Sequence, residues 1–124
     1  MKILIIEDES FLQELLSRKF AFEHFEPAIA SNVEEARIVL QQGSMDAILL
    51  DIMLPGVDGL SFLKELRADP RWNKTPVIII SNLSQDDEIK KVREAGASDY
   101  IVKAQADPDE VVAKVRQCVA TALT

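Results

Sequence analysis

The sequence contains little cysteine and little glycine, with one cysteine and four glycines among 124 residues. A single thiol cannot form an intramolecular disulfide or a cysteine-rich metal site. Cys118 falls at helical spacing with Val111, Val115 and Val119, so we expect it to pack in the core. Hydrophobic residues make up 48% of the chain and charged residues 28%. This composition excludes a disordered chain and indicates an ordinary globular domain.

Long apolar runs are also absent. The first one, Ile3 to Ile6, stops at the acidic residues Glu7, Asp8 and Glu9, which excludes the apolar region of a signal peptide. No other run approaches the length that crosses a membrane. We therefore expect a cytoplasmic protein that does not insert into membranes.

Basic residues are in the minority, 14 against 21 acidic ones, and the net charge is −7. Such a charge repels phosphate backbones, and no local basic stripe offsets it. Direct binding to nucleic acid is therefore disfavoured. Neither a GxGxxG nor a P-loop pattern follows the first apolar run, so nucleotide binding has little support.

What the sequence does contain is a regular alternation of short apolar runs with amphipathic segments. The runs predict five strands, at Lys2–Glu7, Glu26–Ser31, Asp46–Asp51, Thr75–Ser81 and Asp99–Lys103. Continuous apolar runs of this kind are typical of strands buried on both faces. No linker or repeat interrupts the alternation, so we expect a single domain over residues 1–124, without an output domain.

Apolar residues with a period near 3.6 predict a helix after each strand. They are Leu12, Leu15 and Leu16; Val33, Ala36 and Leu40; Phe62, Leu63 and Leu66; Ile89 and Val92; and Val111, Val112, Val115 and Val119. N-cap spacing is present in Ser31 with Glu34, in Ser84 with Asp87, and in Asp107 before Pro108. Gly43 and Gly96 are placed to end the second and fourth helices.

Five strand–helix units predict an α/β fold, a doubly wound five-stranded parallel sheet with helices on both faces. The strand order cannot be read from the residues, but five units most often take the flavodoxin-like order 2-1-3-4-5. In such sheets ligands bind beyond the carboxyl ends of the strands.

Polar residues occur at the carboxyl ends of four of the five predicted strands. In chain order they are Glu7 and Asp8, Asp51, Ser81 and Lys103. Each alone would be an ordinary polar strand end. Three carboxylates at one edge repel one another unless a cation offsets their charge, and Mg²⁺ prefers oxygen ligands and phosphate. The sequence therefore predicts a site for Mg²⁺ and a phosphoryl group.

Asp51 is the best candidate nucleophile, because it closes the apolar run Ala47 to Leu50 and begins a loop. A carboxylate can attack phosphorus to form an aspartyl phosphate. Mg²⁺ and a lysine, here Lys103, can neutralise the charge of the transferred group.

These residues resemble the receiver domains of two-component response regulators over nearly the whole chain. The matching motifs are residues 2–9 (KILIIEDE), 51–59 (DIMLPGVDG), 76–81 (PVIIIS) and 96–103 (GASDYIVK). The spacings between Asp8, Asp51, Ser81 and Lys103 are also similar to those of the family.

The resemblance implies that Glu7, Asp8 and Asp51 bind Mg²⁺ together with the backbone carbonyl of Met53. Asp51 would receive its phosphoryl group from a histidine kinase or a phosphotransfer protein, and Lys103 would contact a phosphoryl oxygen.

The resemblance also implies a switch. The Ser81 hydroxyl would move toward the phosphoryl group and Tyr100 would turn inward, which would reshape the surface of the fourth helix, fifth strand and fifth helix for a downstream protein target. A dimer formed on phosphorylation is left open. We place on this surface the charged residues Lys90, Lys91, Arg93, Asp99 and Arg116.

Four positions depart from the family pattern or vary within it. Ala104 stands where most receivers have a proline after a cis peptide, and Asn82 replaces a small residue. Met53 and Leu83 occupy two variable positions that influence the attacking water, and because both are apolar we expect slow self-dephosphorylation.

Two alternatives remain. A phosphohydrolase of the haloacid dehalogenase type shares the sheet, the nucleophilic Asp and Mg²⁺, but needs a second Asp where this chain has Met53. A pseudo-receiver would keep the fold as a binding module without phosphorylation, and the complete set of polar strand ends argues against it.

Overall fold

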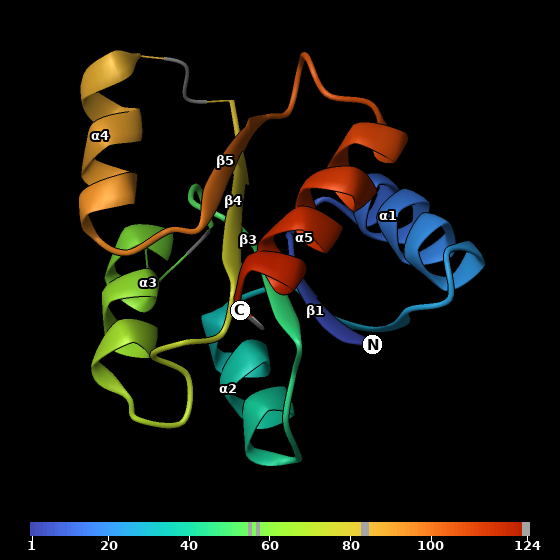
Figure 1. The fold of residues 1–124 in the computed structure, drawn as a ribbon, viewed down its shortest axis with the longest axis horizontal. Coiled ribbons are helices and arrows are strands. Elements are labelled where there is room, and N and C mark those ends of the chain that lie inside the picture. Colours follow the sequence, from blue (N-terminus) through green and yellow to red (C-terminus); the bar gives the residue numbers. More distant parts are fainter. Residues whose placement is uncertain (55, 57, 83–84, 123–124) are drawn as a thin grey trace.

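The computed structural model describes residues 1–54, 56, 58–82 and 85–122, in which five strands alternate with five helices (Figure 1). The strands are β1 (Lys2–Ile6), β2 (Glu26–Ala30), β3 (Ala47–Asp51), β4 (Val77–Ser81) and β5 (Asp99–Val102). The helices are α1 (Ser10–Phe22), α2 (Val33–Gln41), α3 (Gly59–Ala68), α4 (Asp86–Glu94) and α5 (Pro108–Ala122). Each predicted strand is therefore present, shortened by one or two residues.

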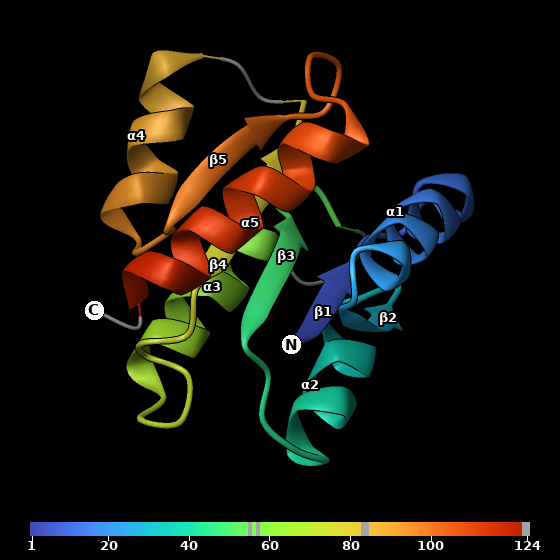
Figure 2. The ribbon, with the colours of Figure 1, turned by 45° about the vertical axis from the view of Figure 1, so that its right-hand side comes forward.

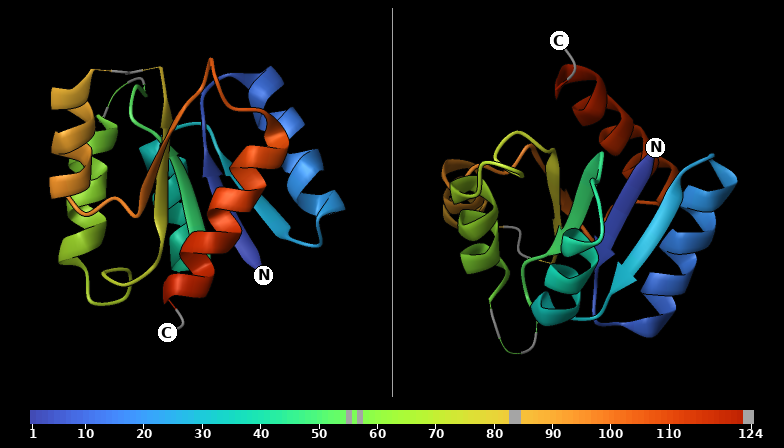
Figure 3. Two further views of the ribbon diagram at one scale, coloured as in Figure 1. Left: turned by 45° about the horizontal axis from the view of Figure 1, so that its top comes forward. Right: turned by 90° about the horizontal axis from the view of Figure 1, so that it is seen from below.

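The strands form one parallel sheet in the order β2-β1-β3-β4-β5. Figure 3 shows α3 and α4 on one side of the sheet and α1 and α5 on the other, and in Figure 2 α5 lies in front of β3 and β4. The predicted doubly wound fold and the order 2-1-3-4-5 are both confirmed.

Two hydrophobic cores result, one on each face of the sheet, because successive side chains of a strand point to opposite faces. In β1, Leu4 and Ile6 pack with α2, α3 and α4, whereas Ile3 and Ile5 pack with α1 and α5. Every residue of β3 and β4 is buried. Cys118 is half-buried and packs against the α1–α5 core, as the helical spacing predicts.

Two expectations about burial are wrong. β2 is not buried on both faces, because it lies at the edge of the sheet, where Pro27 is tolerated in a strand. Leu15 is not a core residue of α1. It is exposed, as are Phe11 and Phe22 of the same helix, while Leu16 and Phe20 face the core.

The N-cap residues of the helices agree only in part with those predicted from the sequence. Asp107 caps α5 as predicted, since its Oδ1 accepts a hydrogen bond from Glu110 N at 2.9 Å. The prediction of Ser31 as the cap of α2 is wrong by one residue. Asn32 is the N-cap, and its Oδ1 accepts from Glu35 N at 2.8 Å. Ser84, the predicted cap of α4, lies outside the described residues.

Gly96 follows the C-cap of α4 with φ of +108°, which favours glycine. The N–H groups of Gly96 and Ala97 donate to the carbonyls of Arg93 and Val92, which ends the helix as predicted. Gly43 occupies the equivalent position after α2 without a positive φ.

Among the helices of the described ranges, none is long and apolar enough to cross a membrane.

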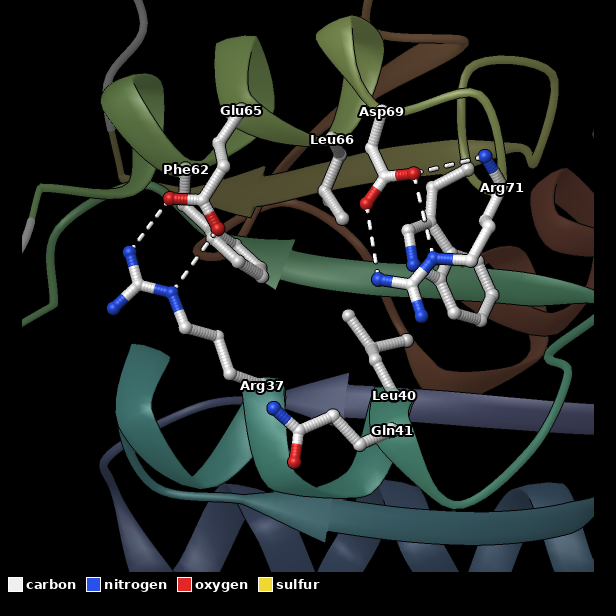
Figure 4. A pocket seen from close by; sticks show the side chains of 9 residues that line it. Arg37, Leu40, Gln41, Phe62, Glu65, Leu66, Asp69 and Arg71 are labelled. Carbon is white, nitrogen blue, oxygen red and sulfur yellow. Dashed lines mark hydrogen bonds and ion pairs between the residues drawn. The ribbon is translucent and has the colours of Figure 1, made fainter.

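A shallow hollow of about 150 Å³ lies between α2 and α3, and Figure 4 shows its ion pairs. Arg37 donates two hydrogen bonds to the carboxylate of Glu65, at 3.0 and 2.6 Å. This pair joins the two helices over a floor that includes Phe62 and Leu66. None of the predicted site residues lines this hollow.

The Arg37–Glu65 pair predicts a pH-dependent contribution to stability. The hydrogen bond from Arg37 lowers the pKa of Glu65, so the stabilisation is present above the ordinary pKa of a Glu, about 4.3, and is lost as the pH falls through the lower folded-state pKa. Glu65→Gln should reduce the free energy of unfolding by about 0.5 kcal/mol at pH 7, because the pair is half-exposed. Urea denaturation at pH 7 and pH 3 tests this, and an equal difference at both values would contradict it.

Candidate functional site

The carboxyl ends of β1, β3, β4 and β5 meet at one edge of the sheet, as the strand order requires. Ile6 pairs with Leu50, so that the next residues, Glu7 and Asp51, come side by side. Asp51 itself pairs with Ile80 of β4, and Ser81 pairs with Val102 of β5. The residues predicted from the strand ends are therefore brought together.

Asp51 is held by groups on both of its carboxylate oxygens. Its Oδ1 accepts a hydrogen bond from Met53 N at 2.9 Å, and its Oδ2 lies 2.8 Å from Lys103 Nζ. The residue is only 2% exposed. One buried carboxylate is thus fixed at the end of a rigid strand, which is the placement a nucleophile needs.

Lys103 bridges two carboxylates, since its Nζ also lies 2.6 Å from Glu7 Oε1. Burial alone would lower the pKa of Lys103, but its hydrogen bonds with Asp51 and Glu7 outweigh burial and raise it. Burial raises the pKa of Glu7, which has no exposed surface, and Lys103 opposes this. The peptide before Ala104 is trans, because the described residues contain no cis peptide, and the lysine nevertheless reaches both acids.

Glu7, Asp8 and Asp51 each offer a carboxylate oxygen within 4.8 Å of the others. This donor set fits a hard divalent cation such as Mg²⁺, which prefers a few carboxylates plus waters and phosphate. A second observation agrees. Glu7 Oε1 is buried, and the ammonium of Lys103 lies 2.6 Å from it. A buried anionic oxygen of this kind is suited to a cation.

Ser81 and Tyr100 lie on the neighbouring strands. Ser81 is buried at the end of β4, and its Oγ has no partner with hydrogen-bond geometry in the described part of the chain. Tyr100 is also buried. Burial raises the pKa of its hydroxyl, and an interaction with the Ser81 side chain partly counters this. The buried Ser81 hydroxyl therefore lies at the end of the strand next to that of Asp51, close to the hydroxyl of Tyr100.

The loop after Asp51 is positioned by Gly59, the first residue of α3. Its N–H donates to the carbonyl of Ile52 at 3.1 Å. A Cβ on Gly59 would lie 2.6 Å from the backbone oxygen of Asp51 and from Ile52 Cα, closer than real contacts allow. Asp58 caps this helix by accepting from Leu60 N. Glycine thus lets α3 start directly against the strand end that carries Asp51. Pro55 and Val57 of this loop lie outside the described residues.

The charged residues expected on the surface of α4, β5 and α5 do not all lie together. Asp99 at the start of β5 pairs with Arg93 of α4 at 3.8 Å and with Lys114 of α5 at 3.5 Å. Arg116 does not belong to it. This side chain instead bonds Glu23 at the end of α1. Helical spacing alone does not decide which neighbouring element an exposed residue of α5 contacts.

Gln13 is a polar residue near the site that the sequence analysis did not single out. Its side-chain Nε2 donates to the backbone carbonyl of Glu7 and, at 2.8 Å, to Ser31 Oγ. A glutamine in the first turns of a helix carries no pattern of its own, so only the fold reveals what it contacts.

Comparison with known proteins adds family information. The sequence profile described as "Response regulator receiver domain" matches residues 3–116. The chain is 36% identical over 115 residues to the phosphate regulon transcriptional regulatory protein PhoB of Rhizobium meliloti, which covers 93% of this chain and 50% of that protein. It is also 36% identical to protein RcaC of Microchaete diplosiphon, covering 94% of this chain and 17% of that one. The chain thus spans half or less of these relatives.

Solved structures agree with the fold. The activated N-terminal receiver domain of Klebsiella pneumoniae RstA superposes with a TM-score of 0.87 at 28% identity, covering 96% of this chain and 98% of that one. The receiver domain of the Francisella response regulator 1452 gives a TM-score of 0.89 at 28% identity, covering 97% of both chains.

Proposed function

Because this chain belongs to the response regulator receiver domain family, we propose that it takes a phosphoryl group from a histidine kinase or phosphotransfer protein onto Asp51. Phosphorylation-based signalling follows from the family, whereas the acceptor residue, the donor and the metal are our proposals. The identity of the acceptor rests mainly on one observation. Asp51 is buried at a strand end, 2.8 Å from Lys103 Nζ and within 4.8 Å of two further carboxylates.

Glu7, Asp8 and Asp51, with the Met53 carbonyl, are the groups we propose for Mg²⁺, which when bound would neutralise charge on the phosphoryl oxygens. An Asp51 oxygen forms the new bond to phosphorus while the bond from phosphorus to the donor's histidine nitrogen breaks. Lys103 then exchanges its contact with the Asp51 carboxylate for a phosphoryl oxygen, and it keeps Glu7 as its second partner.

The start of α1 supplies a contact surface for the donor. Phe11 is 72% exposed, and only two residues separate it from Asp8. Leu15, one turn further, is also exposed on this helix. Exposed apolar side chains beside a polar site are typical of protein contacts. We therefore place the phosphodonor protein over α1.

Ser81 and Tyr100 would transmit the change. A phosphoryl group on Asp51 presents an acceptor to the buried Ser81 hydroxyl, which would move toward it. Tyr100, which we expected to turn inward, is already buried in this structure, so the movement of Ser81 would instead change the contact between these two side chains. The surface of α4, β5 and α5, including the Arg93–Asp99 pair, would then differ for a downstream protein or a second copy.

The experiment is to incubate the protein with acetyl phosphate and MgCl₂ and to measure its intact mass. We expect the gain of one phosphoryl group, and loss of this gain when EDTA is present. No gain with retained partner binding would support the pseudo-receiver. Repeated turnover of a phosphomonoester would support the phosphohydrolase, although Met53 cannot act as its general acid.

We predict slow self-dephosphorylation, because the Met53 side chain next to the acceptor is apolar and cannot orient a water molecule. Met53 is 61% exposed, so a substitution there should leave the fold intact. Met53→Asn should release phosphate several-fold faster. The measurement is the loss of phosphorylated mass after the donor is removed, and loss within seconds from the wild type would contradict the prediction. Leu83, the other position, lies outside the described residues.

A further inference from the structure

Gln13 joins two loops at the edge of the sheet that carries the site. Its side-chain nitrogen donates to the backbone carbonyl of Glu7, at the end of β1, and to Ser31 Oγ, just beyond the end of β2. A carbonyl can only accept, so the NH₂ group of the amide must face Glu7. Both protons of this group are therefore in use, and the side chain has one orientation.

The Gln13 bond completes the fixation of Glu7. The Glu7 N–H donates to the Ala30 carbonyl, and Glu7 Oε2 accepts from Glu9 N. The carbonyl of Glu7 comes after the last ladder residue of β1, and it is Gln13 that satisfies it. The carbonyl of the Glu7–Asp8 peptide is thus held by Gln13, and the N–H groups of the two flanking peptides, those of Glu7 and Glu9, are also hydrogen-bonded.

Asp8 depends on this peptide for its direction. Asp8 is exposed, and within the described residues its carboxylate has no hydrogen bond or ion pair. Glu7 and Asp51, in contrast, are held through their side chains by Lys103. Only the backbone therefore keeps the Asp8 carboxylate within 4.8 Å of the other two acids.

We propose that Gln13 is a positioning residue for Asp8, which it orients toward a divalent cation through the Glu7–Asp8 peptide. This inference rests on the proposed metal site. The hydrogen bond to the Glu7 carbonyl orients the Glu7–Asp8 peptide, and the hydrogen bond to Ser31 Oγ links the same amide to the loop between β2 and α2. Loss of Gln13 leaves all three carboxylates in place but frees the direction of one of them.

The test is an NMR titration of the folded protein with MgCl₂ at constant ionic strength, following the amide signals of residues 7–9 and 51–53. Gln13→Met keeps the length and helix propensity of the side chain but removes both donors. We expect a Kd for Mg²⁺ about 3- to 10-fold weaker, less than the 10- to 100-fold typical when a direct partner of a metal ligand is lost. Phosphorylation by acetyl phosphate should recover at saturating MgCl₂.

Ser31→Ala is the matched control. It removes one acceptor of the same amide and leaves the bond to Glu7, so its Kd should stay within about twofold of the wild type. Thermal unfolding of each variant separates stability from binding, and Gln13→Ala replaces Gln13→Met if the latter does not fold. A Gln13 variant with lower stability but an unchanged Kd for Mg²⁺ would overturn the proposed role of Gln13 and leave the proposed metal site unaffected. A wild type that does not bind Mg²⁺ would overturn the metal site as well.

Discussion

Asp51→Asn is expected to abolish phosphoryl uptake while the domain stays folded. An amide has no carboxylate oxygen to attack phosphorus, and its size is that of the acid it replaces. The oxygen of the new side-chain amide can keep the bond from Met53 N, and Lys103 keeps its contact with Glu7. The intact mass after incubation with acetyl phosphate and MgCl₂ should not change for this variant, whereas the wild type gains one phosphoryl group.

Asp58→Asn is the matched control for this loss. Asp58 lies on the same loop and caps α3 through Leu60 N. Asn caps helices about as well as Asp, so the substitution removes one carboxylate near the site without disturbing the helix. We expect normal uptake. Phosphorylation of Asp51→Asn at the wild-type level would show that another residue is the acceptor.

Arg67→Met is expected to cause the largest loss of stability, about 3 kcal/mol. Arg67 is half-buried on α3, and its guanidinium donates to the carbonyls of Gly96, Trp72 and Thr75 at 2.8, 2.9 and 2.7 Å. Burial lowers the pKa of this arginine. Removal of the guanidinium leaves the carbonyls of Gly96 and Thr75, on two different loops, without this donor, at about 1–3 kcal/mol for each one that water cannot reach. The Trp72 carbonyl keeps its hydrogen bond from Thr75 N.

Urea denaturation at pH 7 measures this effect, and Arg71→Met provides the comparison. Arg71 is close in sequence, but its side chain is 66% exposed, pairs with Asp69 and lies over the ring of Trp72. Exposed pairs of this kind contribute little, so no measurable change is expected. If Arg67→Met were as stable as Arg71→Met, the three carbonyl contacts would not be structural. If these contacts are structural, amide hydrogen exchange in Arg67→Met should increase most around Gly96, in the turn between α4 and β5.

Where sequence rules are local, they describe this protein well. Asp107 caps α5 because the cap involves only residues of the same turn. The rule was wrong at Ser31 since Asn32, an equally good cap, is one residue closer to the helix. Leu15 shows the limit of periodicity. It lies next to Leu16 on α1, and the position of the neighbouring α5 and sheet decides which of the two faces the core.

β2 shows another limit. Its sequence, EPAIA, is mostly apolar, and the one sign of an edge position in it is Pro27, which cannot donate a hydrogen bond to a neighbouring strand. The order 2-1-3-4-5 was expected from the habits of such folds, and the residues themselves do not contain it.

The sequence by itself determined the alternation of strands and helices and the polar residues that end four of the strands, because periodicity and strand ends depend on near neighbours. Only the tertiary structure decided that Lys103 bridges Asp51 and Glu7, which are far apart along the chain, since the strand order brings the ends of β1, β3 and β5 to one edge. The same holds for Gln13 and Arg67. Gln13 donates to one backbone carbonyl and Arg67 to three. Because any residue can supply a carbonyl, the packing of the sheet and helices decides which ones these side chains reach.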